Sequence, residues 1–439
     1  MFRQFATRIA HRPVLRLLLT AAGVLLLSVF LALWRHNGST YYTGLWDDGS
    51  QALVFGRMLQ MQQDQSAPGG FMGVYTEEWG DNQNRYMYRD NTPVEPEQFQ
   101  SYTHQTGLQG WAFGVLNKVF SVIEDRGEAR EQMLYTTNSV LFYAVTLCLC
   151  LVVLHVVGEL PALAWLAAAL LAPWVQRGMK DLYWCLWLWW LPALAGIALC
   201  VAVRRRGHAP AWAFGGIFAA CLLRCLCGFE FISTFLILCE IPLVYCWSRA
   251  LCRREPARPW VLRMVGAGFS AVGGVAAALV IWLAQGVLYY GNLADSWQNV
   301  AAAVTSRVSV SDDAVRAVTV PQVLQKYLMN PDPVLQIGPL GVSVLGLLLA
   351  TTVLVLVTAI LLRWLDPAAL LRLPPLLCVW GLSFLAPVSW MVLSKAHADI
   401  HVQLIPMLWN FAFVPVSCML LGALVSLLAG SVFRRCRKS

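Results

Sequence analysis

The segment VLRLLLTAAGVLLLSVFLALW, residues 14–34, decides the fold, because Arg16 is its only charged residue. A helix of about 20 mostly apolar residues covers the roughly 30 Å hydrocarbon core of a bilayer. Nine more segments are similarly apolar: 134–157, 160–174, 182–203, 211–227, 229–247, 264–289, 337–362, 374–393 and 402–432. The sequence therefore predicts an all-α polytopic membrane protein with about ten transmembrane helices, in which residues 1–439 form a single integral-membrane domain.

The composition and the charge pattern support this prediction. Hydrophobic residues make up 58% of the chain and charged residues 13%, whereas a soluble domain has roughly 25% charged residues. Basic residues fall on one side of the membrane in a ten-span arrangement: Arg3, Arg8, Arg12, Arg16, Arg204, Arg205, Arg206, Arg249, Arg253, Arg254, Arg258, Arg263, Arg363, Arg372, Arg434, Arg435, Arg437 and Lys438. The positive-inside rule then places both termini in the cytoplasm. The net charge of +8 follows from this bias, so the expected partner is the lipid bilayer and no nucleic acid is needed.

Two long extracytoplasmic loops follow from this topology, residues 35–133 and 290–336. Neither loop contains a cysteine, although the chain has 13. A disulfide framework or a cysteine-based zinc site is therefore not expected in either loop, and no cofactor is assigned. A loop of about a hundred residues is far longer than a connector needs to be, and such loops are usually functional or disordered.

The first loop contains two predicted juxtamembrane helices. Apolar residues recur at helical spacing over 108–120, which is typical of an amphipathic helix. A second helix is expected directly after Asp47-Asp48. Because polar residues such as Gln105 and Gln109 accompany an apolar face, both helices are expected to lie along the membrane surface. Residues 62–100 between them are polar and rich in glycine and proline, which predicts a flexible loop and a candidate lid.

Charged residues at the membrane edge are the candidate functional groups, since a charge beside hydrocarbon is costly unless it is paired or hydrated. One group is Asp47-Asp48, and the other is Lys395, His397 and His401 in the segment before the last span. Asp48 or the neighbouring Ser50 is alternatively a simple N-cap for the helix that follows, because both residue types favour that position.

This order of elements resembles the GT-C superfamily of polyprenyl-phosphate-dependent glycosyltransferases. The segment 47–59, DDGSQALVFGRML, is similar to the acidic-pair segment of the protein O-mannosyltransferases and the aminoarabinose transferases. In those transferases the second acidic residue is Glu, whereas this chain has Asp48. The aromatic residue that they carry inside the following helix is at a different position in this chain. Bacterial membrane proteins of polysaccharide clusters carry a Lys-x-His-x-x-x-His segment like the one that begins at Lys395. The resemblance implies an active site on the extracytoplasmic face of a bacterial cytoplasmic (inner) membrane.

The resemblance also implies roles for these residues. An inverting glycosyltransferase moves a sugar from a polyprenyl-phosphate donor to a hydroxyl of a glycan, lipid or protein acceptor, and one carboxylate removes the acceptor proton. Asp47 or Asp48 is expected to supply that base. Lys395, His397 and His401 are expected to hold the donor phosphate. Two alternatives remain open for this second group: a divalent metal site completed by Asp399, or an ordinary solvated loop.

Further charges and aromatic rings are expected near the same membrane level. Arg224 lies within a predicted span and Glu230 follows it, so the two form either a structural ion pair or a substrate contact. Lys180 and Asp181 precede a tryptophan-rich segment, 183–190, which is either an interfacial aromatic belt or the wall of a sugar or isoprenoid site.

Other functions stay open at this stage. They are a membrane transporter, a flippase, and a polysaccharide polymerase or ligase that uses lipid-linked glycans. A transporter would place its charges near the membrane midplane and often shows internal repeats, and neither feature is evident here.

Overall fold

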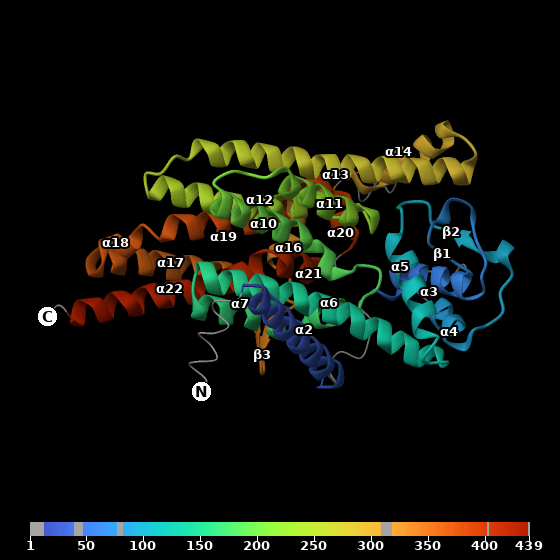
Figure 1. The fold of residues 1–439 in the computed structure, drawn as a ribbon, viewed down its shortest axis with the longest axis horizontal. Coiled ribbons are helices and arrows are strands. Elements are labelled where there is room, and N and C mark those ends of the chain that lie inside the picture. The colour runs from blue at the N-terminus through green and yellow to red at the C-terminus, as the bar shows by residue number, and fades with distance from the viewer. Residues whose placement is uncertain (1–12, 39–46, 77–81, 309–317, 402–403, 438–439) are drawn as a thin grey trace.

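The computed structural model describes residues 13–38, 47–76, 82–308, 318–401 and 404–437, and the fold is nearly all-α. Long helices run side by side through most of the molecule (Figure 1). A smaller region, here called the α3–α5 region and comprising residues 48–120, lies at one end of this bundle (Figure 1). The predicted all-α membrane class is confirmed to this extent.

Within the described residues, seven helices are long and apolar enough to cross a bilayer. They are α2 (Pro13–Gly38), α6 (Gly127–Val156), α12 (Ile232–Cys252), α13 (Arg258–Tyr290), α17 (Val344–Leu365), α19 (Leu373–Leu393) and α22 (Phe413–Cys436). Large apolar side chains on them are widely exposed, as Leu26 (71%) and Phe269 (76%) show. Since exposed leucine and phenylalanine of this density suit hydrocarbon and not water, these helices form a membrane-embedded bundle.

The predicted count of ten is confirmed only in part, because three of the segments form shorter helices. These are α7 (Glu159–Leu171), α10 (Leu191–Arg206) and α11 (Ala211–Leu226). With 13, 16 and 16 residues, they extend about 20–24 Å, less than the hydrocarbon thickness of roughly 30 Å.

Short elements replace parts of the predicted spans. Two of them are the small helices α8 (Pro173–Gly178) and α9 (Leu186–Trp189), so the segment predicted to start a span at 182 begins with a compact turn. The antiparallel hairpin of β3 (Leu335–Ile337) and β4 (Leu340–Val342) precedes α17. Outside the α3–α5 region, the structure also has α14 (Leu293–Val308), α16 (Val320–Leu328), α18 (Pro367–Leu370), α20 (Lys395–Ile400) and α21 (Ile405–Phe411).

The α3–α5 region is a folded unit around one buried helix. Its elements are α3 (Asp48–Gln62), η1 (Pro68–Gly70), β1 (Gly73–Val74), α4 (Gln83–Asp90), η2 (Pro96–Gln98), β2 (Gln100–Ser101) and α5 (Leu108–Phe120). Every residue of α3 from 51 to 61 is buried, so the prediction that this helix lies on the membrane surface is wrong. Gly56 allows the close packing, because a Cβ there would lie 2.1 Å from Gly73 O. The described part of 62–100 is likewise folded, with Phe71, Met72 and Tyr88 fully buried.

Helix α5 forms where the periodicity predicts it, but its apolar face points outward. Trp111, Val115 and Val119 are 39%, 56% and 58% exposed, whereas Gln109 and Asn117 are buried. The face of α5 that carries Gln109 and Asn117 therefore packs on the rest of the α3–α5 region. The face that carries Trp111, Val115 and Val119 is exposed.

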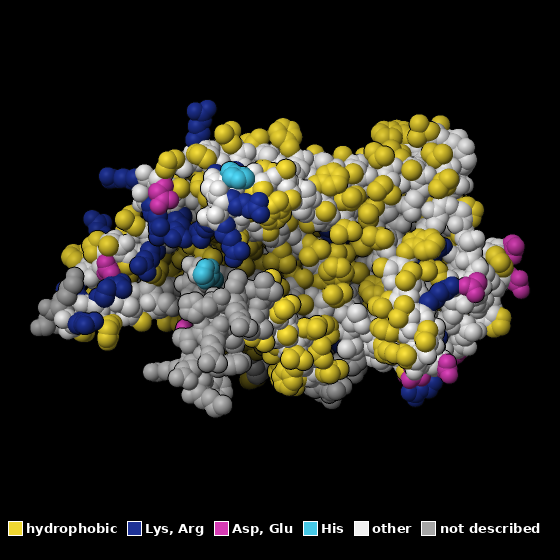
Figure 2. Space-filling model, viewed as in Figure 1, with side chains coloured by type: hydrophobic (Ala, Val, Ile, Leu, Met, Phe, Trp, Pro, Cys, Tyr) yellow, Lys and Arg dark blue, Asp and Glu magenta, His cyan; other side chains and the backbone are white. Residues whose placement is uncertain are grey.

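The two ends of the bundle differ in charge. At one end α10, α12, α17 and α22 finish with arginines in their last turns and α13 begins with one; we call this the arginine-rich end. Figure 2 shows Lys and Arg side chains gathered at the end where α18 lies, and a broad hydrophobic surface beyond them. The α3–α5 region lies toward the opposite end (Figure 1).

Candidate active site

The first element of the site is the start of α3. Asp47 is the N-cap of this helix: its Oδ1 accepts a hydrogen bond from Ser50 N at 3.1 Å. The predicted cap, Asp48 or Ser50, is therefore wrong by one position or more, because Asp47 is the last residue with non-helical backbone angles. The other carboxylate oxygen, Oδ2, accepts a hydrogen bond from Trp184 Nε1 at 2.9 Å. The side chain of Asp48 lies outside what the structure describes.

The second element is the turn that carries Trp184. Asp181 Oδ1 accepts hydrogen bonds from the backbone N–H groups of Tyr183 (2.9 Å) and Trp184 (3.0 Å). Gln51 Oε1 accepts another from Leu182 N at 3.1 Å. The predicted substrate-binding residue Asp181 is thus a buried organiser of this turn, and it sets the position of the tryptophan that contacts Asp47.

The third element is the loop between α11 and α12. Arg224 is buried, and its Nη1 and Nη2 donate to the backbone carbonyls of Gly228 (2.9 Å) and Glu230 (3.1 Å). Gly228 has φ of +144°, and a Cβ there would lie 2.4 Å from Glu230 Oε2. Phe231 has the unusual φ of +62° for a non-glycine residue. Arg224 therefore shapes a strained loop that places the Glu230 carboxylate.

The fourth element is α20, which the second long loop holds in place. Lys326 Nζ pairs with Asp399 Oδ1 at 2.8 Å, and Tyr327 donates its hydroxyl to Ala398 O at 2.9 Å. The ion pair engages the carboxylate that the metal alternative needed. Among the residues that the structure describes, no group of three or more His, Cys, Asp and Glu side chains is placed to hold a metal ion.

The two histidines of this segment lie together, as their one-turn spacing predicts, with ring centroids 4.3 Å apart. Burial lowers the pKa of His401, and the nearby carboxylates of Asp47 and Glu230 oppose that shift only in part. Both carboxylates therefore lie within electrostatic range of His401. Because its pKa is below the usual value of about 6.5, it is a neutral imidazole at pH 7 and not the fixed cation that the sequence suggested.

These contacts bring together side chains from four distant parts of the chain. The ring centroid of Trp184 lies 5.7 Å from that of Phe231, and the centroid of Phe231 lies 5.1 Å from that of Trp390. The centroids of Trp390 and His397 are 5.8 Å apart. His397 then contacts His401, which lies within electrostatic range of Asp47, the partner of Trp184. Two carboxylates and an imidazole thus lie near one another beside these aromatic rings.

The tryptophan-rich segment 183–190 supplies some of these aromatic rings. Tyr183, Trp184, Trp189 and Trp190 are all at most 7% exposed, so the interpretation as a lipid-facing aromatic belt is wrong. Trp189 packs on Phe231 (4.7 Å) and on Phe411 (4.1 Å). The segment therefore forms an internal aromatic wall.

A row of buried amides lies beside Glu230. Gln105 is fully buried near Gly228, and neither its Oε1 nor its Nε2 has a partner among the described residues. Gln109 donates to Tyr183 O (3.2 Å) and Cys227 O (2.9 Å), and its Oε1 lacks a described partner. Buried polar atoms are normally satisfied by protein or by ordered water, so these amides have unused capacity to bind water or a polar ligand.

Lys180 and Lys395 are both half-buried, and neither ammonium group forms a hydrogen bond or ion pair with the residues that the structure describes. Burial lowers the pKa of Lys180. Lys395 begins α20, two residues before His397. Of the predicted site residues, the structure brings Asp47, Glu230, His397 and His401 near one another, and assigns Asp181 and Arg224 to supporting positions.

Sequence reasoning missed Phe231, Trp390, Gln51 and the pair Lys326–Tyr327. Nothing in the local sequence marks these residues, because their partners lie far along the chain. The positive φ of Phe231 and the aromatic contacts of Trp390 are visible only in the folded protein.

Comparison of the chain with protein-family models, with curated proteins and with solved structures gave no match. The function must therefore be argued from the site itself.

Proposed function

We propose that this protein is a membrane glycosyltransferase that moves a sugar from a polyprenyl-phosphate donor to an acceptor hydroxyl. The observation that supports the proposal is that two carboxylates, Asp47 and Glu230, lie within electrostatic range of His401, beside aromatic rings that include Trp184, the hydrogen-bond partner of Asp47. Such a site suits a sugar ring, because aromatic faces cover its apolar C–H surface while carboxylates and amides contact its hydroxyls.

Asp47 is the proposed general base. Each carboxylate oxygen accepts one hydrogen bond from the protein and keeps further lone-pair capacity for the acceptor hydroxyl. The acceptor oxygen attacks the anomeric carbon as its proton passes to Asp47. The bond from that carbon to the phosphate oxygen breaks, and the lipid phosphate leaves with the electron pair. The configuration at the anomeric carbon is inverted.

Cations and hydrogen-bond donors stabilise the departing phosphate in this proposal. Lys395 supplies a positive charge, and His397 and the neutral His401 supply N–H donors. Charge-assisted contacts of this kind are about twice as strong as neutral ones. Lys180 is a second candidate cation. Arg224 and Asp181 act as positioning residues, because their contacts are with the loops that carry Glu230 and Trp184.

The membrane placement follows from two features. The arginine-rich end faces the cytoplasm by the positive-inside rule, which puts both termini there and the site on the extracytoplasmic side of a bacterial inner membrane. The uncovered apolar face of α5, with Trp111, Val115 and Val119 exposed, lies at the bilayer interface. A lipid-linked donor then reaches the site laterally from the outer leaflet.

The test is release of polyprenyl phosphate by the purified protein from a panel of polyprenyl-phosphate monosaccharides, with Asp47→Asn against wild type. Asp47→Asn is expected to lower turnover at least about 10²-fold, the lower range for a general base. Asp64→Asn is the matched control, because Asp64 is an exposed residue of the same region that pairs with Lys118. Equal turnover of Asp47→Asn and wild type would remove the base assignment. Movement of labelled lipid or sugar across liposomes without phosphate release would favour the transporter or flippase alternatives.

A further inference from the structure

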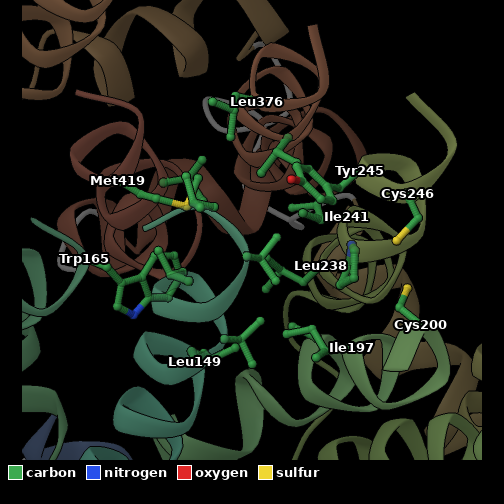
Figure 3. Close-up of a pocket in the computed structure, with 18 of the residues that line it drawn as sticks. Leu149, Trp165, Ile197, Cys200, Leu238, Ile241, Tyr245, Cys246, Leu376 and Met419 are labelled. Carbon is green, nitrogen blue, oxygen red and sulfur yellow. The ribbon is translucent and has the colours of Figure 1, made fainter. Parts of the chain in front are cut away.

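An apolar cavity of about 160 Å³ lies inside the helix bundle (Figure 3). It lies between α6, α7, α10, α12, α19 and α22, and its wall includes Leu149, Ile197, Leu238 and Met419 (Figure 3). Cavities of this kind, about 150 Å³ with an apolar lining, stay dry and bind apolar guests. The cavity therefore fits a hydrocarbon group.

A second cavity, of about 440 Å³, lies next to the first at the arginine-rich end. The two share four lining residues, namely Val156, Val157, Tyr245 and Leu376. The second cavity is lined in addition by Arg249, Arg253 and Arg372. These arginines come from two separate parts of the chain, the end of α12 and the segment before α19.

The arginines around this cavity are largely without counter-charges. Arg253 lies 4.0 Å from Glu255, an exposed pair. The guanidinium groups of Arg249 and Arg372 form no hydrogen bond or ion pair with the residues that the structure describes, and none of the described residues that line the cavity is acidic. The positive-inside bias accounts for arginines at this end of the bundle, but it does not require three of them to meet at the mouth of an apolar cavity.

We propose that the two cavities form one binding site for an amphiphile that has a phosphate headgroup and a hydrocarbon chain. The headgroup contacts Arg249, Arg253 and Arg372, and the chain enters the apolar cavity toward Trp165 and Trp190. Arginine suits this task because its planar guanidinium binds phosphate oxygens bidentately. An anionic membrane phospholipid and free polyprenyl phosphate share this chemistry.

This site is separate from the candidate active site. Helix α12 begins next to Phe231 and ends at Cys252, so the arginines at its end lie roughly 30 Å from the carboxylates. The inference therefore does not depend on the proposed catalytic role of Asp47.

The test uses the full-length protein, stripped of lipid in detergent, and native mass spectrometry to count bound lipids. Phosphatidylglycerol, phosphatidylcholine with the same chains, and polyprenyl phosphate are the three probes. Wild type is expected to retain phosphatidylglycerol or polyprenyl phosphate at least about tenfold more than phosphatidylcholine. The better of the two anionic probes identifies the source of the ligand.

Two variants separate the headgroup from the chain. Arg249→Gln with Arg372→Gln is expected to abolish the preference for anionic lipid, whereas Arg205→Gln with Arg206→Gln, arginines that do not line either cavity, leaves it intact. Ile197→Trp fills the apolar cavity and is expected to lower retention of every lipid, and its thermal midpoint reports whether it is folded. Equal retention of phosphatidylglycerol and phosphatidylcholine by wild type would overturn the proposal. So would an unchanged preference in the Arg249–Arg372 double variant.

Discussion

The two ends of helix α12 hold their charges in opposite ways. At the N-terminal end, Arg224, Asp181 and Asp47 are tied by hydrogen bonds to loops or rings, and the aromatic rings beside them are buried. At the C-terminal end, Arg249 has no described ion pair and Arg253 has one at 4.0 Å with an exposed partner. One end is rigidly organised, and the other presents adaptable cations around an open cavity.

This difference separates two kinds of function. Catalysis requires groups that are already oriented before the substrate arrives. Binding of a lipid headgroup tolerates mobile side chains, because a flexible arginine side chain can turn its guanidinium toward the phosphate after the lipid arrives. The carboxylate end therefore suits chemistry and the arginine-rich end suits recognition. Substitutions should then cause large losses of turnover at the first end and changes of lipid preference at the second.

The largest effect tests which carboxylate does the chemistry. In the proposed reaction Glu230 binds the substrate without taking its proton, so Glu230→Gln is expected to lower turnover about tenfold, less than the loss of a general base. Asp47→Asn is expected to lower it at least about 10²-fold. Arg205→Gln with Arg206→Gln, at the arginine-rich end, should leave turnover within a factor of about two. The measurement is the turnover number in the phosphate-release assay, and a larger loss for Glu230→Gln than for Asp47→Asn would make Glu230 the base.

The fold was predictable where local pattern suffices. The long apolar helices, the helix at 108–120 and the arginine bias follow from composition and spacing. The burial of α3 was not predictable. The face that was expected to meet solvent is covered by α4, α5 and β1, and the packing of these elements on α3 is a tertiary property. The segment that begins at 182 was predicted as a span, since apolar composition does not distinguish a buried turn such as 182–190 from the start of a membrane helix.

The site was predictable only residue by residue. Membrane-edge charges pointed to Asp47, Glu230, His397 and His401, but their arrangement depends on contacts between remote parts of the chain. Asp47 and Trp184 are 137 positions apart in sequence. Arg224 was identified as costly within a span, yet its partners are backbone carbonyls of a strained loop, which no side-chain pattern reveals.

The strain in the Glu230 loop gives the second prediction. Gly228→Ala is expected to lower the free energy of unfolding by about 1–3 kcal/mol more than Gly291→Ala, because alanine tolerates a φ of +144° poorly and its new Cβ displaces the side-chain ends Glu230 Oε2 and Gln105 Oε1. Gly291 is a matched control with φ of +80° and no atom within 4 Å of an added Cβ. Denaturant titration of both variants measures the difference, and turnover of Gly228→Ala should fall with the displaced carboxylate. Equal destabilisation of the two variants would show that the loop is not tightly organised.

The third prediction concerns the contribution to stability of the hydrogen bond from Trp184 to Asp47. Trp184→Phe keeps an aromatic ring and removes the N–H that donates to the carboxylate. Its expected cost is about 1.5–3 kcal/mol, since the acceptor is charged. Trp187→Phe loses a hydrogen bond to the neutral Asn138 Oδ1 at 3.0 Å, for which about 0.5–1.5 kcal/mol is expected. Both variants shrink an indole to a phenyl ring, so the difference in their free energies of unfolding isolates the charge. A smaller cost at Trp184 than at Trp187 would contradict the proposed organisation.

The smallest effect concerns the pH dependence of stability at His401. Burial lowers its pKa in the folded protein, so the unfolded chain, with a value of about 6.5, binds the proton more readily. Stability therefore falls as pH decreases from about 6.5, and the fall ends once the folded imidazole is protonated as well. His401→Gln should flatten this part of the profile by a few °C in thermal midpoint, a shift typical of a sub-kilocalorie to kilocalorie change. His208→Gln, an exposed histidine beside the arginines that end α10, is the matched control and should keep the wild-type profile. If His401→Gln and wild type lose stability in parallel between pH 7.5 and pH 5, His401 is not held neutral by its surroundings, and the contrast between a preorganised end and an adaptable end would no longer include this histidine.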